Sequence, residues 1–116
     1  MINVEIYRNL DNNIYGFKLC GHAGFAKQGF DIVCSAVTIL VFNTINCIEE
    51  FTNEKFSCEC DEDNGGFIEC FFYDIKKGNY NNEADILLRA MVKGLKNIEI
   101  EYYDYVSVYD RRCSEC

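Results

Sequence analysis

The chain has 116 residues, 49% hydrophobic and 15% aromatic, which excludes a disordered protein and predicts one globular domain over residues 1–116. Its 11 Lys and Arg against 19 Asp and Glu give a net charge of −8, which argues against direct nucleic-acid binding and favours a basic partner. No basic segment followed by an apolar run opens the sequence, and the longest apolar stretch, residues 37–42, is too short to cross a bilayer. We therefore expect a cytoplasmic protein without membrane contact.

The first half of the chain predicts two strands and a helix. Apolar and polar side chains alternate over residues 2–9, and after a turn at 11–13 residues 14–23 form the hairpin partner. Residues 24–30 lack regular apolar spacing and predict a loop. From Asp31, a good N-cap residue, to about Glu50, apolar residues recur at helical spacing. Their stripe is broad, which predicts that the helix is covered by the sheet and by a second subunit.

The second half repeats this pattern and adds a strand. Alternation over residues 55–60, an acidic, glycine-rich turn at 61–66 and alternation over 67–74 predict a second hairpin. A polar loop at 79–82 leads to a helix over 84–97, and residues 102–111 form the last strand. The order β-β-α-β-β-α-β predicts an α+β fold of two layers, with a mostly antiparallel sheet and both helices on one face.

One histidine and one cysteine flank the predicted loop. His22, the chain's single histidine, ends the second strand off its apolar face, and Cys34 follows at the start of the first helix. A helix N-terminus stabilises a thiolate, and a nearby imidazole would stabilise it further and later protonate a leaving amine. The backbone N–H groups of Ser35 and Ala36 are candidate donors to an oxyanion. The loop is a candidate lid over this site, and the residues assigned to it are Gly21, Ala23, Gly24, Phe25 and Gly29.

Both residues also have an ordinary interpretation. A single histidine at a strand end is usually a surface residue, and a single cysteine in an apolar helix is usually a core thiol. Their separation along the chain carries little information, because catalytic pairs meet in space rather than in sequence.

Two runs around these residues resemble the signature of the ribosomal-processing cysteine proteases, the Prp family. They are Gly-His-Ala at 21–23 and Asp-Ile-Val-Cys at 31–34, the second followed by small residues. Gly94-Leu95 and Tyr105-Val106 resemble the family's C-terminal part, and the order of elements agrees. The resemblance implies a cysteine endopeptidase that removes the short N-terminal extension of a large-subunit bacterial ribosomal protein during ribosome assembly, by a Cys-His dyad and an acyl-enzyme.

The resemblance also implies roles for single residues. Cys34 is the nucleophile, His22 its base, and Asp31 a helper of the dyad or an anchor of the loop, in a homodimeric enzyme. Thr38 stands where the family often has a serine, and the proline common near the last strand is missing, but neither departure removes a catalytic group. A ribosomal-protein precursor is basic, so the opposite net charge of this chain would speed encounter. We expect no cofactor.

The chain contains eight cysteines, and those other than Cys34 favour an inert role. A cytoplasmic compartment keeps thiols reduced, and Cys58, Cys60 and Cys70 share the apolar face of the second hairpin, which predicts buried thiols there. The pairs Cys58/Cys60 and Cys113/Cys116 lack standard zinc-site spacing, so we expect no metal. Two alternatives stay open, namely a non-catalytic ribosome-associated binding protein and a metal or redox protein built on the cysteine pairs.

Overall fold

Five strands form one sheet in the computed structural model, which describes residues 1–21, 30–61 and 66–111, except for the side chains of residues 30 and 31. The strands run in the spatial order β3-β4-β2-β1-β5, and neighbours are antiparallel except β1 and β5, which are parallel. Their bounds are β1 Ile2–Arg8, β2 Ile14–Cys20, β3 Ser57–Asp61, β4 Phe67–Phe71 and β5 Val106–Asp110.

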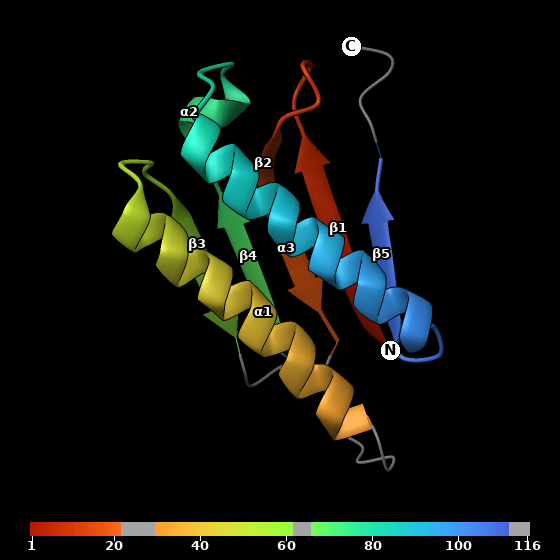
Figure 1. Cartoon of the computed structure of the whole chain (residues 1–116). Helices are drawn as coiled ribbons and strands as arrows, with labels where there is room; N and C mark the ends of the chain where they lie inside the picture. The colour runs from red at the N-terminus through yellow and green to blue at the C-terminus, as the bar shows by residue number, and fades with distance from the viewer. Residues whose placement is uncertain (22–29, 62–65, 112–116) are drawn as a thin grey trace.

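Two long helices, α1 (Phe30–Phe51) and α3 (Asn82–Glu101), lie side by side across one face of this sheet (Figure 1). The predicted two-layer α+β fold and its order of elements are confirmed. A short helix that the sequence did not predict, α2 (Tyr73–Lys76), takes up the end of the strand expected to run to residue 74. Helix α3 begins earlier than predicted, because the Asn81 side chain accepts a hydrogen bond from the Ala84 N–H and caps it.

The core fills the space between the helices and the covered face of the sheet. Both helices present residues three, four or seven apart to it, while every second strand residue points inward. The two helices approach closely at Gly94, where an added Cβ would lie 2.8 Å from the Leu40 side chain. Buried core residues include Val4, Ile6, Phe17, Leu19, Val33, Val37, Val41, Ile48, Leu88, Met91 and Leu95.

Helix α1 is more apolar than the short run at residues 37–42 indicated. By length and composition alone, its segment Ile32–Phe51, with a mean hydropathy of 1.7, is sufficient to cross a membrane. A core helix of a soluble protein passes the same test, and α1 does bury one side against the sheet. The opposite side exposes Ile32 and Ile39, and Phe51 is exposed as the last residue of the helix. The expectation of no membrane contact therefore stays a prediction.

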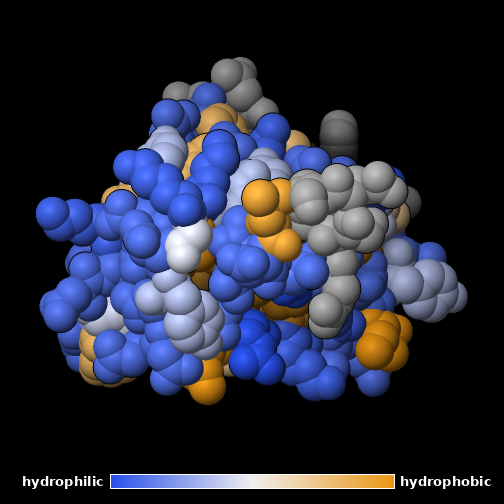
Figure 2. Space-filling view, turned by 90° about the horizontal axis from the view of Figure 1, so that it is seen from above, coloured by the Kyte–Doolittle hydropathy of each residue, from blue (hydrophilic) through white to orange (hydrophobic). Residues whose placement is uncertain are grey.

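Unlike the apolar helix α1, the rest of the visible surface is consistent with the charged composition of the chain. The face seen from above in Figure 2 is mostly hydrophilic, and hydrophobic residues appear on it as separate small patches.

The prediction that the cysteines of the second hairpin are buried, reduced thiols is wrong for all three, because Cys58 and Cys70 are not reduced and Cys60 is not buried. Cys58 and Cys70 lie directly opposite each other in the β3–β4 register, with their Cα atoms 4.1 Å apart, and form a disulfide. Cys70 is buried, but Cys58 and Cys60 are exposed, because β3 is the edge strand of the sheet. Cys20, Cys34, Cys47 and Cys60 are free thiols.

A charged cluster ties the two parallel strands to α3. The Arg8 guanidinium donates to both carboxylate oxygens of Asp110, at 2.6 and 2.9 Å, and the Lys96 ammonium donates to the same carboxylate at 2.8 Å. These bonds, that from Arg8 above all, lower the pKa of Asp110 from 3.8 to about 2.

The Asp110 cluster makes a prediction for acid stability. Because the folded-state pKa lies below the ordinary value, Asp110 stabilises the fold above about pH 4 and loses this effect as the pH falls toward 2. We expect the Asp110→Asn variant to be less stable than the wild type at neutral pH, and the gap to close toward pH 2. Urea denaturation at neutral pH and near pH 2 measures this difference in the free energy of unfolding. The exposed Asp104→Asn is the control. A gap that stayed constant with pH would contradict the assignment.

Candidate active site

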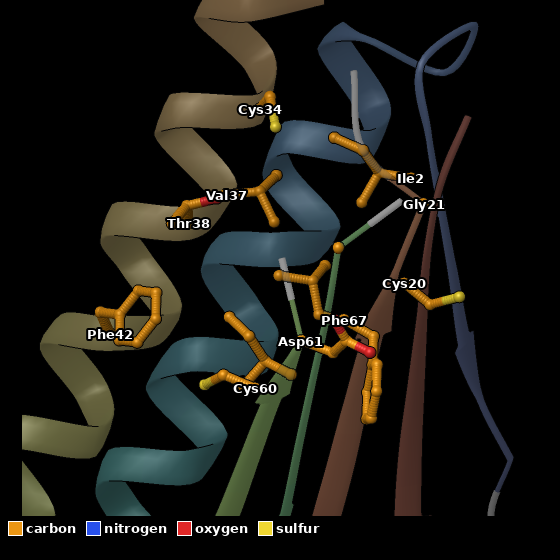
Figure 3. A pocket seen from close by; sticks show the side chains of 13 residues that line it. Ile2, Cys20, Gly21, Cys34, Val37, Thr38, Phe42, Cys60, Asp61 and Phe67 are labelled. Atoms are coloured by element: carbon orange, nitrogen blue, oxygen red, sulfur yellow. The ribbon is translucent and has the colours of Figure 1, made fainter. Parts of the chain in front are cut away.

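A pocket of about 390 Å³ opens between α1 and the ends of β1 to β4 (Figure 3). Its walls are mostly apolar, and Asp61 is the charged residue among those that line it in the described part of the chain. Helix α1 contributes Cys34, Val37, Thr38 and Phe42, and the strands and their ends contribute Ile2, Leu19, Cys20, Gly21, Cys60, Asp61, Gly66, Phe67 and Ile68.

Cys34 is the thiol that both lines this pocket and lies near the start of a helix. It is the fifth residue of α1, half-buried, and its side chain lies on the wall of the pocket that faces the strands (Figure 3). The position places its sulfur near the N-terminal end of α1, where the helix dipole has its positive end. The pocket in front of it provides room for a peptide side chain and carbonyl.

The predicted loop leaves and re-enters the described structure at this pocket. Gly21, which lines the pocket, follows the last residue of β2, and its N–H donates to the Gly66 carbonyl at 3.2 Å. His22 is the next residue, and with Ala23, Gly24, Phe25 and Gly29 it lies outside the described residues. The chain returns at Phe30, one helical turn before Cys34. Gly21, in the lining of the pocket, and Phe30, one turn before Cys34, are therefore the described residues on either side of residues 22–29.

The start of α1 differs from the prediction. The helix begins at Phe30, so Asp31 is its second residue rather than its N-cap. Ser35 and Ala36 lie past Cys34, and both are exposed. An N–H group inside an α-helix donates to the carbonyl four residues earlier, so the amides of Ser35 and Ala36 donate along the helix toward residues 31 and 32. This geometry does not favour them as oxyanion donors.

Thr38, Phe42 and Cys60 are among the pocket residues that received no functional role from the sequence. Thr38 and Phe42 follow Cys34 at spacings of four and eight, which places all three on one face of the helix. That spacing could have assigned Thr38 and Phe42 to the site from the sequence alone. Cys60, grouped with the inert thiols, reaches the pocket from β3 because strand order brings this edge strand beside α1 (Figure 3).

The described residues contain no group of three or more His, Cys, Asp or Glu side chains placed to hold a metal ion. Cys58, one member of the first cysteine pair, is already bonded to Cys70, and the second pair, Cys113 and Cys116, lies outside the described residues.

Comparisons with known proteins point to one family. The family model described as cysteine protease Prp matches residues 1–107. The ribosomal processing cysteine protease Prp of Bacillus subtilis is 32% identical over 108 residues, which are 93% of this chain and 96% of that relative.

Solved structures agree with the family match. The essential ribosomal processing protease Prp from Staphylococcus aureus, in complex with a substrate peptide, is 29% identical, with a TM-score of 0.82 over 93% of this chain and 97% of its own. The same protease with a covalently linked product peptide is 29% identical, with a TM-score of 0.80 over 94% and 98% of the two chains.

Proposed function

The chain belongs to the cysteine protease Prp family, and on that premise we propose that residues 1–116 act as one domain that removes a short N-terminal extension from a large-subunit bacterial ribosomal protein. The observation that supports this most is the position of Cys34, beside the start of α1 and on the wall of the pocket. A covalently linked product peptide in the Staphylococcus aureus relative is what nucleophilic catalysis leaves behind.

In the proposed reaction the Cys34 thiol transfers its proton to His22, and the sulfur attacks the carbonyl carbon of the scissile peptide bond. The C–N bond breaks as His22 protonates the leaving amine, which leaves a thioester between Cys34 and the N-terminal fragment. Water, deprotonated by His22, then hydrolyses the thioester and restores the thiol. The helper role of Asp31 is part of the same proposal.

The chemistry of the pocket indicates which peptides fit. Its lining by Val37, Phe42, Phe67 and Ile68 favours an apolar substrate side chain next to the cut. The net charge of −8 attracts a basic ribosomal protein over longer distances. We propose that the enzyme works without a cofactor in the cytoplasm, where its substrate is made.

The proposal is tested on the host's own ribosomal protein. The precursor with its N-terminal extension is incubated with the purified full chain, and the products are weighed by mass spectrometry. We expect a single cut that releases the extension, and a short-lived enzyme species heavier by the extension peptide less one water. An uncut precursor, with the chain folded, would refute this substrate; cleavage without any covalent species would refute the acyl-enzyme.

We also propose that the enzyme is a homodimer joined through the outer face of α1. Ile32 and Ile39 lie on that face with 69% and 68% of their surface exposed, although residues of their kind are usually buried. Two copies of such a helix face can bury these side chains against each other.

The variant Ile39→Asp is therefore expected to be monomeric. A buried unpaired carboxylate at each side of the interface opposes association, and light scattering should show the 13.4 kDa chain in place of a particle of twice that mass. Ile100→Asp is the matched control, because Ile100 is 73% exposed but lies near the end of α3. If Ile39→Asp stays dimeric, the interface lies elsewhere.

A further inference from the structure

A second groove lies at the opposite end of the sheet from the candidate active site. It has a volume of about 670 Å³, and its lining comes from α3 and from Arg8 at the end of β1. The active-site pocket is lined by Ile2 at the start of the same strand, about 20 Å away at 3.3 Å per residue. The lining residues of the groove are Arg8, Ile86, Arg89, Ala90, Val92, Lys93 and Lys96.

Four of these seven residues are cationic, and their partners neutralise them only in part. Arg8 and Lys96 share the carboxylate of Asp110, and Arg89 approaches Asp85 at 3.6 Å. Lys93 is exposed, and no interaction with it is found among the described residues. The two carboxylates leave the groove with two positive charges in excess, in a chain whose net charge is −8.

The cations are arranged in a line. Arg89, Lys93 and Lys96 are spaced by four and three residues, so they lie on one side of α3 and extend over about 10 Å of its axis. A row of cations along an open groove can bind a polymer whose anionic groups recur at regular intervals. None of the described residues that line the groove is aromatic, so the groove lacks the aromatic side chains on which nucleic-acid bases commonly stack.

We propose that this groove binds the phosphate backbone of RNA without reading its sequence, and so holds the enzyme on a ribosomal particle that carries its substrate. The part of this proposal that places the enzyme on a ribosomal particle rests on the proposed function. The binding of RNA itself does not depend on peptide cleavage. The strongly negative remainder of the chain is repelled by RNA, so attraction confined to the groove fixes which side of the enzyme faces it. This departs from the expectation drawn from net charge, which averages over the whole surface.

The test measures binding of the full chain to a fluorescent RNA of about 16 nucleotides, by anisotropy, between about 50 and 200 mM salt. With three phosphate contacts, log K should fall with log salt with a slope of about −2. The variant Arg89→Gln/Lys93→Gln should reduce the size of that slope by about 1 to 2 and bind RNA of any sequence more weakly. It spares Arg8 and Lys96, which hold Asp110.

The matched control is Lys55→Gln/Lys77→Gln, which removes the same charge from two exposed residues outside the groove. We expect it to bind RNA with the wild-type slope. Equal weakening in both variants, or no measurable binding by the wild type, overturns the proposal. Displacement of RNA by polyglutamate at equal charge concentration also overturns it, because the groove would then be a site for acidic peptides.

Cleavage of a free precursor peptide separates this proposal from the proposed function. The groove variant should cut the peptide at the wild-type rate, because neither substituted residue lines the active-site pocket. If RNA binds as expected but no peptide is cut, the proposed function fails and the RNA site stands.

Discussion

Replacement of Cys34 by alanine is expected to abolish removal of the N-terminal extension, with a loss in rate of about 10⁴-fold or more. The variant lacks the atom that forms the thioester, so only transition-state binding by the rest of the pocket remains. Cys34 is half-buried at the pocket wall, and alanine is a good helix former, so α1 should keep its structure. The measurement is the single-turnover rate of precursor cleavage, followed by mass spectrometry.

Two further variants make this prediction specific to the dyad. His22→Ala should lower the rate by about 10² to 10⁴-fold, because water would have to accept and donate the proton in place of the imidazole. Cys60→Ala is the matched control, since Cys60 is a free thiol that lines the same pocket from β3. It should cut at close to the wild-type rate. If Cys34→Ala cuts normally and Cys60→Ala does not, the nucleophile has been assigned to the wrong cysteine.

Local patterns of the sequence were sufficient for most of the fold. Alternation predicted the paired strands β1 and β2, and helical spacing predicted α1 and α3, because a half-buried strand and a core-facing helix impose periods of two and about 3.6 on apolar residues. The predictions that failed depend on how the strands are arranged in the sheet. Cys58, Cys60 and Cys70 do share a face, as predicted, but nothing in their spacing reveals that β3 is the edge strand and that Cys58 and Cys70 lie in register.

The candidate site follows the same division. The position of Cys34 near a helix start was predictable, because apolar spacing marks where α1 begins to within one residue. That single residue matters for Asp31, which moves from the N-cap into the helix. The pocket itself was not predictable, because Ile2, Cys60 and Phe67 come from three strands that only the sheet order brings together beside α1.

Replacement of Gly21 by alanine is expected to lower cleavage by about 10²-fold, although Gly21 has no side chain to take part in the reaction. Gly21 has φ of +86°, and a Cβ at this position would collide with the carbonyl oxygen of Met1. The backbone must therefore shift where β2 ends, directly before His22 and on the rim of the pocket. A displacement of about 1 Å in a catalytic group is enough for a loss of this size. Fold stability should also fall, by about 1–3 kcal/mol for the strained backbone.

Gly78→Ala separates the backbone strain from the collision. Gly78 has φ of +105°, but a Cβ there meets nothing within 4 Å, and Gly78 does not line the pocket. This control should lose stability and cleave normally. Gly21→Asn adds a second comparison, because asparagine tolerates positive φ but still carries the colliding Cβ, so its cleavage should remain low while part of the stability returns. Urea denaturation and single-turnover cleavage measure the two effects separately. Wild-type cleavage by Gly21→Ala would mean that the end of β2 does not position His22.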